Sequence, residues 1–353
     1  MITGAEERIL AIDVGAGTQD ILVYEPGVSV ENSVQMVVPS QTVVVGRRIR
    51  RATAERRDVF LAGNLMGGGA SVRAMQAHLD AGLRVYATPL AAKTIRDDLE
   101  QVRAMGVLLA DEPPKGAALV QARDIDLEAI GGALAAFEVA LPARYAVAVQ
   151  DHGECFGCSQ RKFRFQMWEQ FLRQGGRLVD LAYTDPPAYL TRLRAVQADL
   201  PGAVVMDTAG AAIWGALQDE AVAARQAEGV IVVNVGNGHT VGALVQGERV
   251  WGLFEHHTGR MTTAKLGDYV ERLRQGTLTN AEVFNDGGHG CQVQEGYSRA
   301  DGFDFVAFTG PNRRLADGLG YYPATPYGDM MIAGCFGLVA AVQAIGESLR
   351  HVL

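Results

Sequence analysis

The chain of 353 residues is longer than one hydrophobic core normally supports, which predicts two domains. Its composition, 48% hydrophobic and 20% charged, is that of an ordinary globular protein. A net charge of −8 argues against nucleic acid as a partner, and no apolar run reaches the length that spans a membrane. With no apolar leader and only four cysteines, we expect a cytoplasmic protein without a disulfide scaffold.

Two short apolar runs flank a glycine-rich turn between residues 9 and 25, which predicts a β-hairpin. The glycines allow positive φ and leave room for a ligand, so several backbone N–H groups can point at one anion. Asp13 ends the first strand, where a carboxylate can hold hydrated Mg²⁺ beside phosphates. The alternative is an ordinary glycine turn. The candidate binding residues beside Asp13 are Gly15, Gly17, Thr18 and Asp20.

After the hairpin, residues 41–46 are predicted to form a further strand of a mixed sheet. The arginine-rich stretch 47–57 is interpreted as a solvated face, in preference to a phosphate-binding patch. A buried strand at 59–63 leads to the triplet Gly67–Gly69 and then to a helical pattern over 70–81. These glycines either present a helix N-terminus to an anion or only let the chain turn tightly.

A strand predicted at 145–150 ends in the densest polar cluster of the chain. Asp151, at this strand end, is a candidate catalytic residue that would act as general base or hold a water molecule. Cys155 and Cys158 follow as a lone Cys-x-x-Cys pair, which could bind a metal, form a disulfide or lie half-buried. An amphipathic helix is predicted after them.

The hairpin pattern returns at residues 230–245, again with an apolar strand, a glycine-rich turn and a second apolar run. Asn234 ends the first strand, and Thr240 is assigned to the position that Thr18 has in the first hairpin. Asn can bind a phosphate or a metal-bound water, but it supplies no carboxylate. Two such hairpins predict two similar halves that face one nucleotide. The candidate binding residues are Asn234, Gly236, Gly238 and Thr240.

Histidines and cysteines gather in strand ends and glycine-rich loops of both halves. One interpretation is a second metal site between the domains, where nitrogen and sulfur ligands favour zinc or iron. The other is that these histidines cap loops and the thiols are separately buried. We expect Cys155 and Cys291 to lie in one interdomain region in either case. The candidate ligands are Cys155, Cys158, His256, His257, His289 and Cys291, with His152 beside them.

In their order along the chain, these segments resemble the superfamily that contains actin, the seventy-kilodalton heat-shock chaperones and the sugar kinases. The resemblance implies an α/β fold of two ribonuclease-H-like domains around a nucleotide cleft, with ATP and Mg²⁺ as cofactors. It places the first domain at residues 1–205 and the second at 206–353, with the final helix packing back at the hinge. The superfamily usually has Asp at the position of Asn234.

The resemblance also extends to a nucleoside-binding turn and two interdomain helices. A strand within 303–313 runs into Gly310, which resembles the superfamily's adenosine loop, although Pro311 replaces its usual second glycine. Asn312 could then face the ribose or the phosphates. Stretches of small residues at 208–217 and 328–342 match the two interdomain helices in position and composition.

At finer grain, the sequence resembles a family labelled "putative pyruvate formate-lyase activating enzyme". A radical-SAM activase holds its iron–sulfur cluster with three cysteines in the pattern Cys-x₃-Cys-x₂-Cys. Only Cys155 and Cys158 have such close spacing here. Radical-SAM chemistry is therefore rejected.

Two functions fit these observations. The first is an ATP-dependent phosphotransferase or ATPase that acts on a small molecule, in which Asp13 organises Mg²⁺ and Asp151 activates the acceptor. The second is a nucleotide-driven conformational switch that activates or repairs a partner protein, such as a metalloenzyme. Neither the small molecule nor the protein partner is identified by the sequence, and an oligomer is compatible with both functions.

Overall fold

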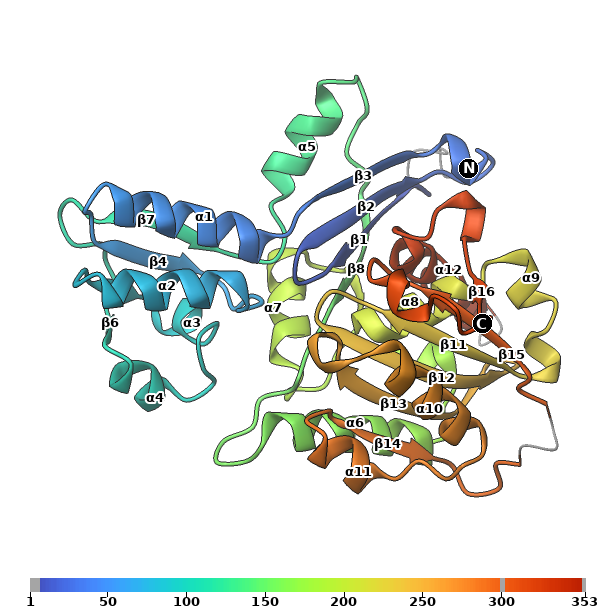
Figure 1. Ribbon diagram of the computed structural model, residues 1–353. Helices are drawn as coiled ribbons and strands as arrows, with labels where there is room; N and C mark the ends of the chain where they lie inside the picture. Colours follow the sequence, from blue (N-terminus) through green and yellow to red (C-terminus); the bar gives the residue numbers. More distant parts are fainter. Residues whose placement is uncertain (1–6, 299–301, 351–353) are drawn as a thin grey trace.

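The computed structural model describes residues 7–298 and 302–350, whose arrangement is shown in Figure 1. Two six-stranded sheets and one four-stranded sheet organise this part of the chain. The four-stranded sheet lies to one side, with the helices that cover it (Figure 1). None of the helices in the described residues is both long and apolar enough to cross a membrane.

The first sheet has the order β3-β2-β1-β8-β10-β9. Its first three strands form an antiparallel meander, and β8 and β10 continue the sheet in parallel with β1. Side chains of β1 are buried on both faces of the sheet, which explains its continuous apolar run. The strands are β1 (Ile9–Val14), β2 (Thr18–Tyr24), β3 (Val34–Pro39), β8 (Arg144–Val149), β9 (Ala182–Tyr183) and β10 (Val204–Met206).

The second sheet repeats this plan in the order β14-β13-β12-β11-β15-β16. Its strands β11, β12 and β13 form the meander, and β15 and β16 continue in parallel with β11. The order of five strands is therefore the same in both sheets, and it confirms the prediction of two ribonuclease-H-like halves in an actin-like ATPase fold. The strands are β11 (Val230–Val235), β12 (His239–Gln246), β13 (Arg249–His257), β14 (Gly290–Val293), β15 (Phe305–Thr309) and β16 (Tyr322–Pro323).

Two helices of small residues pack against each other between these sheets (Figure 1). They are α8 (Thr208–Ala216), which follows the first sheet, and α12 (Ala333–Arg350), which follows the second. A Cβ added to Gly215 would overlap the carbonyl oxygen of Ala333, and one added to Gly337 would overlap that of Ala211. Glycine is needed at both positions because the two backbones approach so closely. The final helix also contacts β1, β2 and β8, so it packs back on the first sheet.

The four-stranded sheet is inserted between β3 and β8. The strand predicted at 59–63 and the helix predicted over 70–81 belong to this region, but a separate sheet was not predicted. Residues 41–46, predicted as a strand, begin helix α1 instead. Val45, Ile49 and Ala52 are buried at helical spacing, and the arginines between them are exposed, as a solvated face requires. All neighbouring strands of this sheet are parallel. Its elements are α1 (Gln41–Ala54), β4 (Val59–Gly63), α2 (Ala70–Asp80), β5 (Val85–Ala87), α3 (Pro89–Ala92), α4 (Leu99–Ala104), β6 (Val107–Leu109) and β7 (Ala118–Ala122).

One helix belongs to the first half in sequence but packs against the second half. Helix α6 (Gln160–Arg173) comes between strands of the first sheet in sequence, yet it packs against β13 and β14 of the second. The predicted boundary at residue 205 falls inside β10 of the first sheet and leaves α6 with the first half, and it stays a prediction. The remaining helices are α5 (Leu127–Ala135), α7 (Thr191–Asp199), α9 (Glu220–Ala223), α10 (Thr263–Arg274) and α11 (Asn280–Asn285).

Candidate functional site

A cavity of about 340 Å³ lies between the two predicted hairpins. Its walls also include the N-terminal turns of α8 and α12, the Gly67–Gly69 triplet and the end of β8. The volume is within the range of small-molecule sites. Of the predicted binding residues, the cavity wall contains Asp13, Gly15, Thr18, Asp20, Asn234, Gly236, Gly238 and Gly310.

The tips of the two hairpins face each other. A Cβ added to Gly17 would lie 3.3 Å from Nδ2 of Asn237, and one added to Gly238 would lie 3.8 Å from Cβ of Ala16. Loops that are 220 residues apart in sequence thus form one concave surface with glycines from both sides. Backbone N–H groups at such a surface can bind the oxygens of a phosphate chain.

The hydrogen bonds of the two turns correct the sequence alignment by one residue. The amide of Gly15 donates to the carbonyl oxygen of Thr18 at 2.8 Å, and the amide of Gly236 donates to that of His239 at 3.0 Å. His239 is therefore the counterpart of Thr18. Thr240, predicted at this place, is fully buried and shares a 3.0 Å hydrogen bond with Thr258, away from the cavity wall.

Two carboxylates, Asp13 and Asp20, lie opposite each other on β1 and β2 at the cavity. In each, the Oδ1 atom is buried and has no hydrogen-bond partner. Burial, with Asp20 and Asp207 nearby, raises the pKa of Asp13 well above its ordinary value. Burial also raises the pKa of Asp20 to about 7. Carboxylate oxygens that lack partners and are hard to ionise fit a hard divalent cation such as Mg²⁺.

The first turn of α12 closes the cavity beside Asp13. A Cβ on Gly334 would overlap the carboxylate of Asp13, and Sγ of Cys335 donates to the carbonyl oxygen of Asp20 at 3.1 Å. The small residues of this turn let the positive end of the helix dipole approach the carboxylates. The interdomain helix is therefore in direct contact with the candidate cation site.

The predicted nucleoside turn packs on the second hairpin. Gly310 has φ +103°, and a Cβ there would collide with Oδ1 of Asn234 and the carbonyl oxygen of Val235. The side-chain amide of Asn312 donates to the carbonyl oxygen of Gly236 at 3.0 Å. Gly310 lines the cavity, whereas Asn312 holds the second hairpin by this hydrogen bond and is not part of the cavity wall.

Asp151 is not placed to act as the predicted general base. Its Oδ2 accepts hydrogen bonds from the amides of Arg192 at 2.9 Å and Leu193 at 3.0 Å, and its Oδ1 accepts one from Gly153 at 2.8 Å. The carboxylate thus caps the start of α7 and is 4% exposed. The residues on either side of it, Gln150 and His152, line the cavity instead. The strand end was correctly predicted, but the side chain that faces the cavity was not.

A buried ionic network, which was not predicted from the sequence, lies behind the cavity. Arg164 of α6 donates through Nε to Oε2 of Glu255 at 2.8 Å and through Nη1 to Oδ2 of Asp207 at 2.8 Å. Burial acts to raise the pKa of Glu255, but Arg164 and the nearby histidines lower it well below its ordinary range. Gln150 and Trp168 also donate to this carboxylate. An arginine in an amphipathic helix is usually solvated, so the pattern alone could not identify it.

Five of the seven histidines gather at one edge of the cavity. Ring nitrogens of His152, His239 and His289 lie within 4.8 Å of one another. Burial lowers the pKa of His239 to about 4 and that of His289 to about 3, and it lowers that of His152 well below its ordinary value. His256 is bonded to Asp286. The four predicted histidines are all among these five, and only His239 was not predicted; the predicted ones are His152, His256, His257 and His289.

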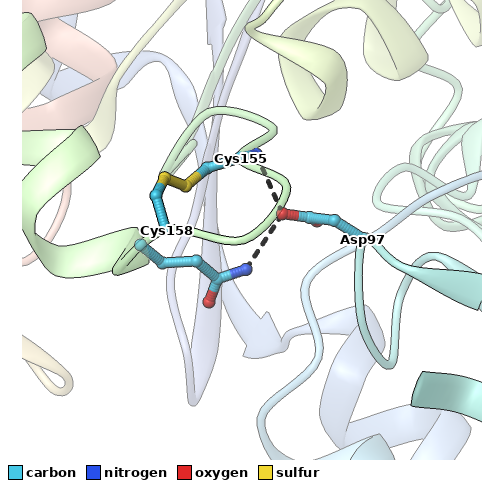
Figure 2. Close-up of a disulfide and its surroundings, with 4 residues drawn as sticks. Asp97, Cys155 and Cys158 are labelled. Atoms are coloured by element: carbon cyan, nitrogen blue, oxygen red, sulfur yellow. Dashed lines mark hydrogen bonds between the residues drawn. A yellow bond between two sulfur atoms is a disulfide. The ribbon is translucent and has the colours of Figure 1, made fainter.

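The cysteines differ from the predicted ligand set. Cys155 and Cys158 form a disulfide in the loop before α6 (Figure 2). Figure 2 also shows Asp97 of the inserted region accepting a 3.3 Å hydrogen bond from the amide of Cys155. Cys291 is buried in the core of the second half, where burial raises the pKa of its thiol to about 12. Among the described residues, the group whose ligand atoms lie close together therefore consists of histidines and includes none of these three cysteines.

The sequence model of one protein family, described as "Putative pyruvate format-lyase activating enzyme (DUF1786)", matches residues 66–315. The chain belongs to this family. A search of curated proteins finds no match. The family description names an activase, but a Cys-x₃-Cys-x₂-Cys motif is missing from the 353 residues.

Solved structures with similar folds are distant. The ethanolamine utilization protein EutJ from Carboxydothermus hydrogenoformans is 11% identical, with 93% of this chain and 88% of that chain covered and a TM-score of 0.28. The PilM-PilN type IV pilus biogenesis complex gives 11% identity, coverage of 96% and 98%, and a TM-score of 0.41. A protein from Listeria monocytogenes titled as an N-acetylmannosamine kinase is 10% identical, with 96% of this chain and 99% of that chain covered and a TM-score of 0.35. The fold assignment accordingly depends on the strand order of the two sheets.

Proposed function

We propose that this protein binds ATP or ADP with Mg²⁺ in the cavity between the two hairpins and acts as a phosphotransferase or ATPase on a small molecule. The observation that carries the proposal is the pair of equivalent glycine turns facing one cavity, with the buried Oδ1 atoms of Asp13 and Asp20, which have no hydrogen-bond partner, at its wall. A nucleotide needs both features, because its phosphates accept hydrogen bonds and its cation prefers oxygen ligands.

In this proposal, the backbone amides at the tips of the two turns, residues 16–17 and 237–238, hold the phosphate oxygens, because the amides of Gly15 and Gly236 already close the turns. Asp13 and Asp20 hold the magnesium ion, which would neutralise negative charge on the phosphates. Gly310 supports the second turn where the nucleoside would pack. The N-terminal ends of α8 and α12 add their positive dipole ends to the same space.

The acceptor would enter from the side of the inserted region, where Thr42 and the Gly67–Gly69 triplet line the cavity. Gln150 and His152 are the polar side chains at the end of β8 on that wall. We assign to them the task of orienting an acceptor hydroxyl or a water molecule, in place of Asp151. Gln150 is itself held by Glu255, at 3.2 Å from Nε2 to Oε1. Catalysis of this kind depends mostly on positioning.

A nucleotide-driven switch that acts on a partner protein is the second candidate, and Asn234 favours it. This residue stands where the first hairpin has Asp13, and it supplies no carboxylate. Slow turnover would suit a switch, in which α8 and α12 move against each other as the halves open and close. Their glycine-lined contact provides a surface for such sliding.

The rate of ADP formation from ATP and Mg²⁺ distinguishes these functions. A phosphotransferase is expected to turn over faster when a small hydroxylated metabolite is added, and a switch only when a protein partner is added. Asp13→Asn should abolish turnover in both cases, whereas Asp185→Asn, a matched change at a side chain that is 91% exposed, should not. Nucleotide turnover that is the same in wild type and Asp13→Asn would contradict the proposed site.

A further inference from the structure

The histidine cluster is a second concentration of ligand atoms, separate from the carboxylates of Asp13 and Asp20. Ring centroids of His152 and His239 are 5.7 Å apart, those of His152 and His289 are 5.5 Å apart, and those of His239 and His289 are 4.9 Å apart. The three rings come from the loop after β8, the second hairpin and the segment before β14. They converge on one point from both halves of the protein.

These imidazoles lack the hydrogen bonds that buried polar groups normally make. His289 is 1% exposed, and neither of its ring nitrogens has a partner. Nε2 of His239 is also buried without a partner. An unpaired buried polar atom costs about 1–3 kcal/mol, so several in one place call for an explanation. A bound ion that accepts their lone pairs provides it.

We propose that His152, His239 and His289 together bind one divalent transition-metal ion of the zinc, iron, cobalt or nickel type. Imidazole nitrogen suits these metals, whereas Mg²⁺ prefers oxygen. Three histidines leave a coordination position open for water or a substrate oxygen, as in catalytic zinc sites. With metal–nitrogen bonds of about 2.1 Å, the ligand atoms would move together by roughly 1 Å on binding.

The environment of the cluster supports an ion of positive charge. Glu255 lies at the cavity wall beside the histidines, and its carboxylate is fixed by Arg164 and Trp168. His257, whose ring is 4.8 Å from that of His289, bonds through Nδ1 to the carbonyl oxygen of Gly287 at 2.8 Å. That bond leaves its Nε2 free, which is the arrangement common for metal-binding histidines, so His257 is the nearest further ligand.

The site adjoins the proposed nucleotide cavity, because His239 belongs to the second phosphate turn and His152 to the cavity wall. Binding of the metal would thus connect the two halves beside the phosphates. The inference about the metal does not require the proposed function to be correct, since the ligands are the protein's own side chains. Metal binding is therefore measured in the absence of nucleotide.

The test is a Co²⁺ titration of the untagged, chelator-treated 353-residue protein, monitored by visible absorption and by calorimetry. One Co²⁺ per chain with the ligand-field bands of a four- or five-coordinate site is expected. His152→Gln, His239→Gln and His289→Gln should each weaken binding by at least about 10–100-fold, the effect that loss of an outer-shell partner alone can have. His78→Gln, the same change at a histidine of the inserted region, should leave it unchanged.

Imidazole ¹⁵N spectra of the wild type with Zn²⁺ provide a measurement that needs no variant. Resonances of the cluster histidines should shift and that of His78 should not. Absence of a bound ion in the folded wild type, or wild-type affinity in all three cluster variants, would overturn the proposal. Inorganic phosphate that shifts the same resonances while Zn²⁺ and Co²⁺ do not would also overturn it, since the cluster would then be an anion site.

Discussion

Arg164 and Glu255 form a buried ion pair that joins the two halves, with 2.8 Å between Nε and Oε2. Arg164 is 2% exposed and Glu255 is fully buried. The helix that carries Arg164 lies between strands of the first sheet in sequence, whereas Glu255 is on β13 of the second. Because Arg164 also bonds Asp207 at the start of α8, one guanidinium connects the second sheet to an interdomain helix.

Arg164→Met is predicted to lower the free energy of unfolding by about 3–5 kcal/mol, because it leaves two carboxylates buried without their cation. Urea denaturation measures the change. Arg177→Ala breaks an exposed ion pair with Asp180 and should cost less than about 1 kcal/mol. Equal effects of the two substitutions would show that the buried network does not hold the halves together.

The close contact between α8 and α12 leads to a second prediction. Gly337→Ala places a methyl group against the backbone of Ala211, so we expect a loss of about 1–3 kcal/mol in unfolding free energy. Gly346→Ala on the same helix meets open space and should raise it by up to about 1 kcal/mol. Thermal and urea unfolding compare the pair. Similar stabilities of the two variants would mean that α8 and α12 are not in close contact in solution.

Asp20 should make stability depend on pH in metal-free protein. Its pKa is raised to about 7 in the folded state, against about 4 in an unfolded chain. Between these values the folded state binds more protons, so the free energy of unfolding falls as pH rises from about 4 to 7. Asp20→Asn should flatten this slope, by at most about 4 kcal/mol over the window. Parallel pH profiles of wild type and variant would contradict the assignment, and Asp185→Asn is the control.

Thiol reactivity tests the arrangement of the cysteines. In the oxidised native protein, no rapid reaction with a thiol reagent is expected, because Cys155 and Cys158 are paired and the other two cysteines are buried. Mild reduction should expose two reactive thiols, and reduction in denaturant should expose all four. Rapid labelling of Cys291 in the native state would conflict with its burial and with its raised pKa.

The sequence was sufficient for the repeated hairpins and the small-residue helices, because their signals are local. Strand, glycine turn and strand follow one another without interruption, and Gly215 and Gly337 lie in runs of small residues. The inserted sheet was missed at its first element. Three consecutive valines at 43–45 favour a strand. The segment is nevertheless helical, because a helix lets Val45 and Ile49 pack together on the inserted sheet.

The site required more than sequence position. His239 follows the second glycine of its turn directly, as Thr18 does in the first turn, so the two residues are equivalent in position. The hydrogen bonds of the two turns make this equivalence unambiguous. Asp151, Gln150 and His152 are neighbours at one strand end, and a strand end does not specify which side chain turns inward. Arg164 could not be found at all, because its partners are about 43 and 91 residues away in sequence.

Calorimetry with Mg-ADP measures whether the cavity between the two hairpins binds a nucleotide. We expect one binding site per chain in the folded wild type, loss of binding when Mg²⁺ is chelated, and affinity at least about 10-fold weaker in Asp13→Asn, since that variant lacks a carboxylate for the cation. Asp185→Asn should bind as the wild type does. A folded wild-type protein that binds neither Mg-ADP nor Mg-ATP would contradict the account.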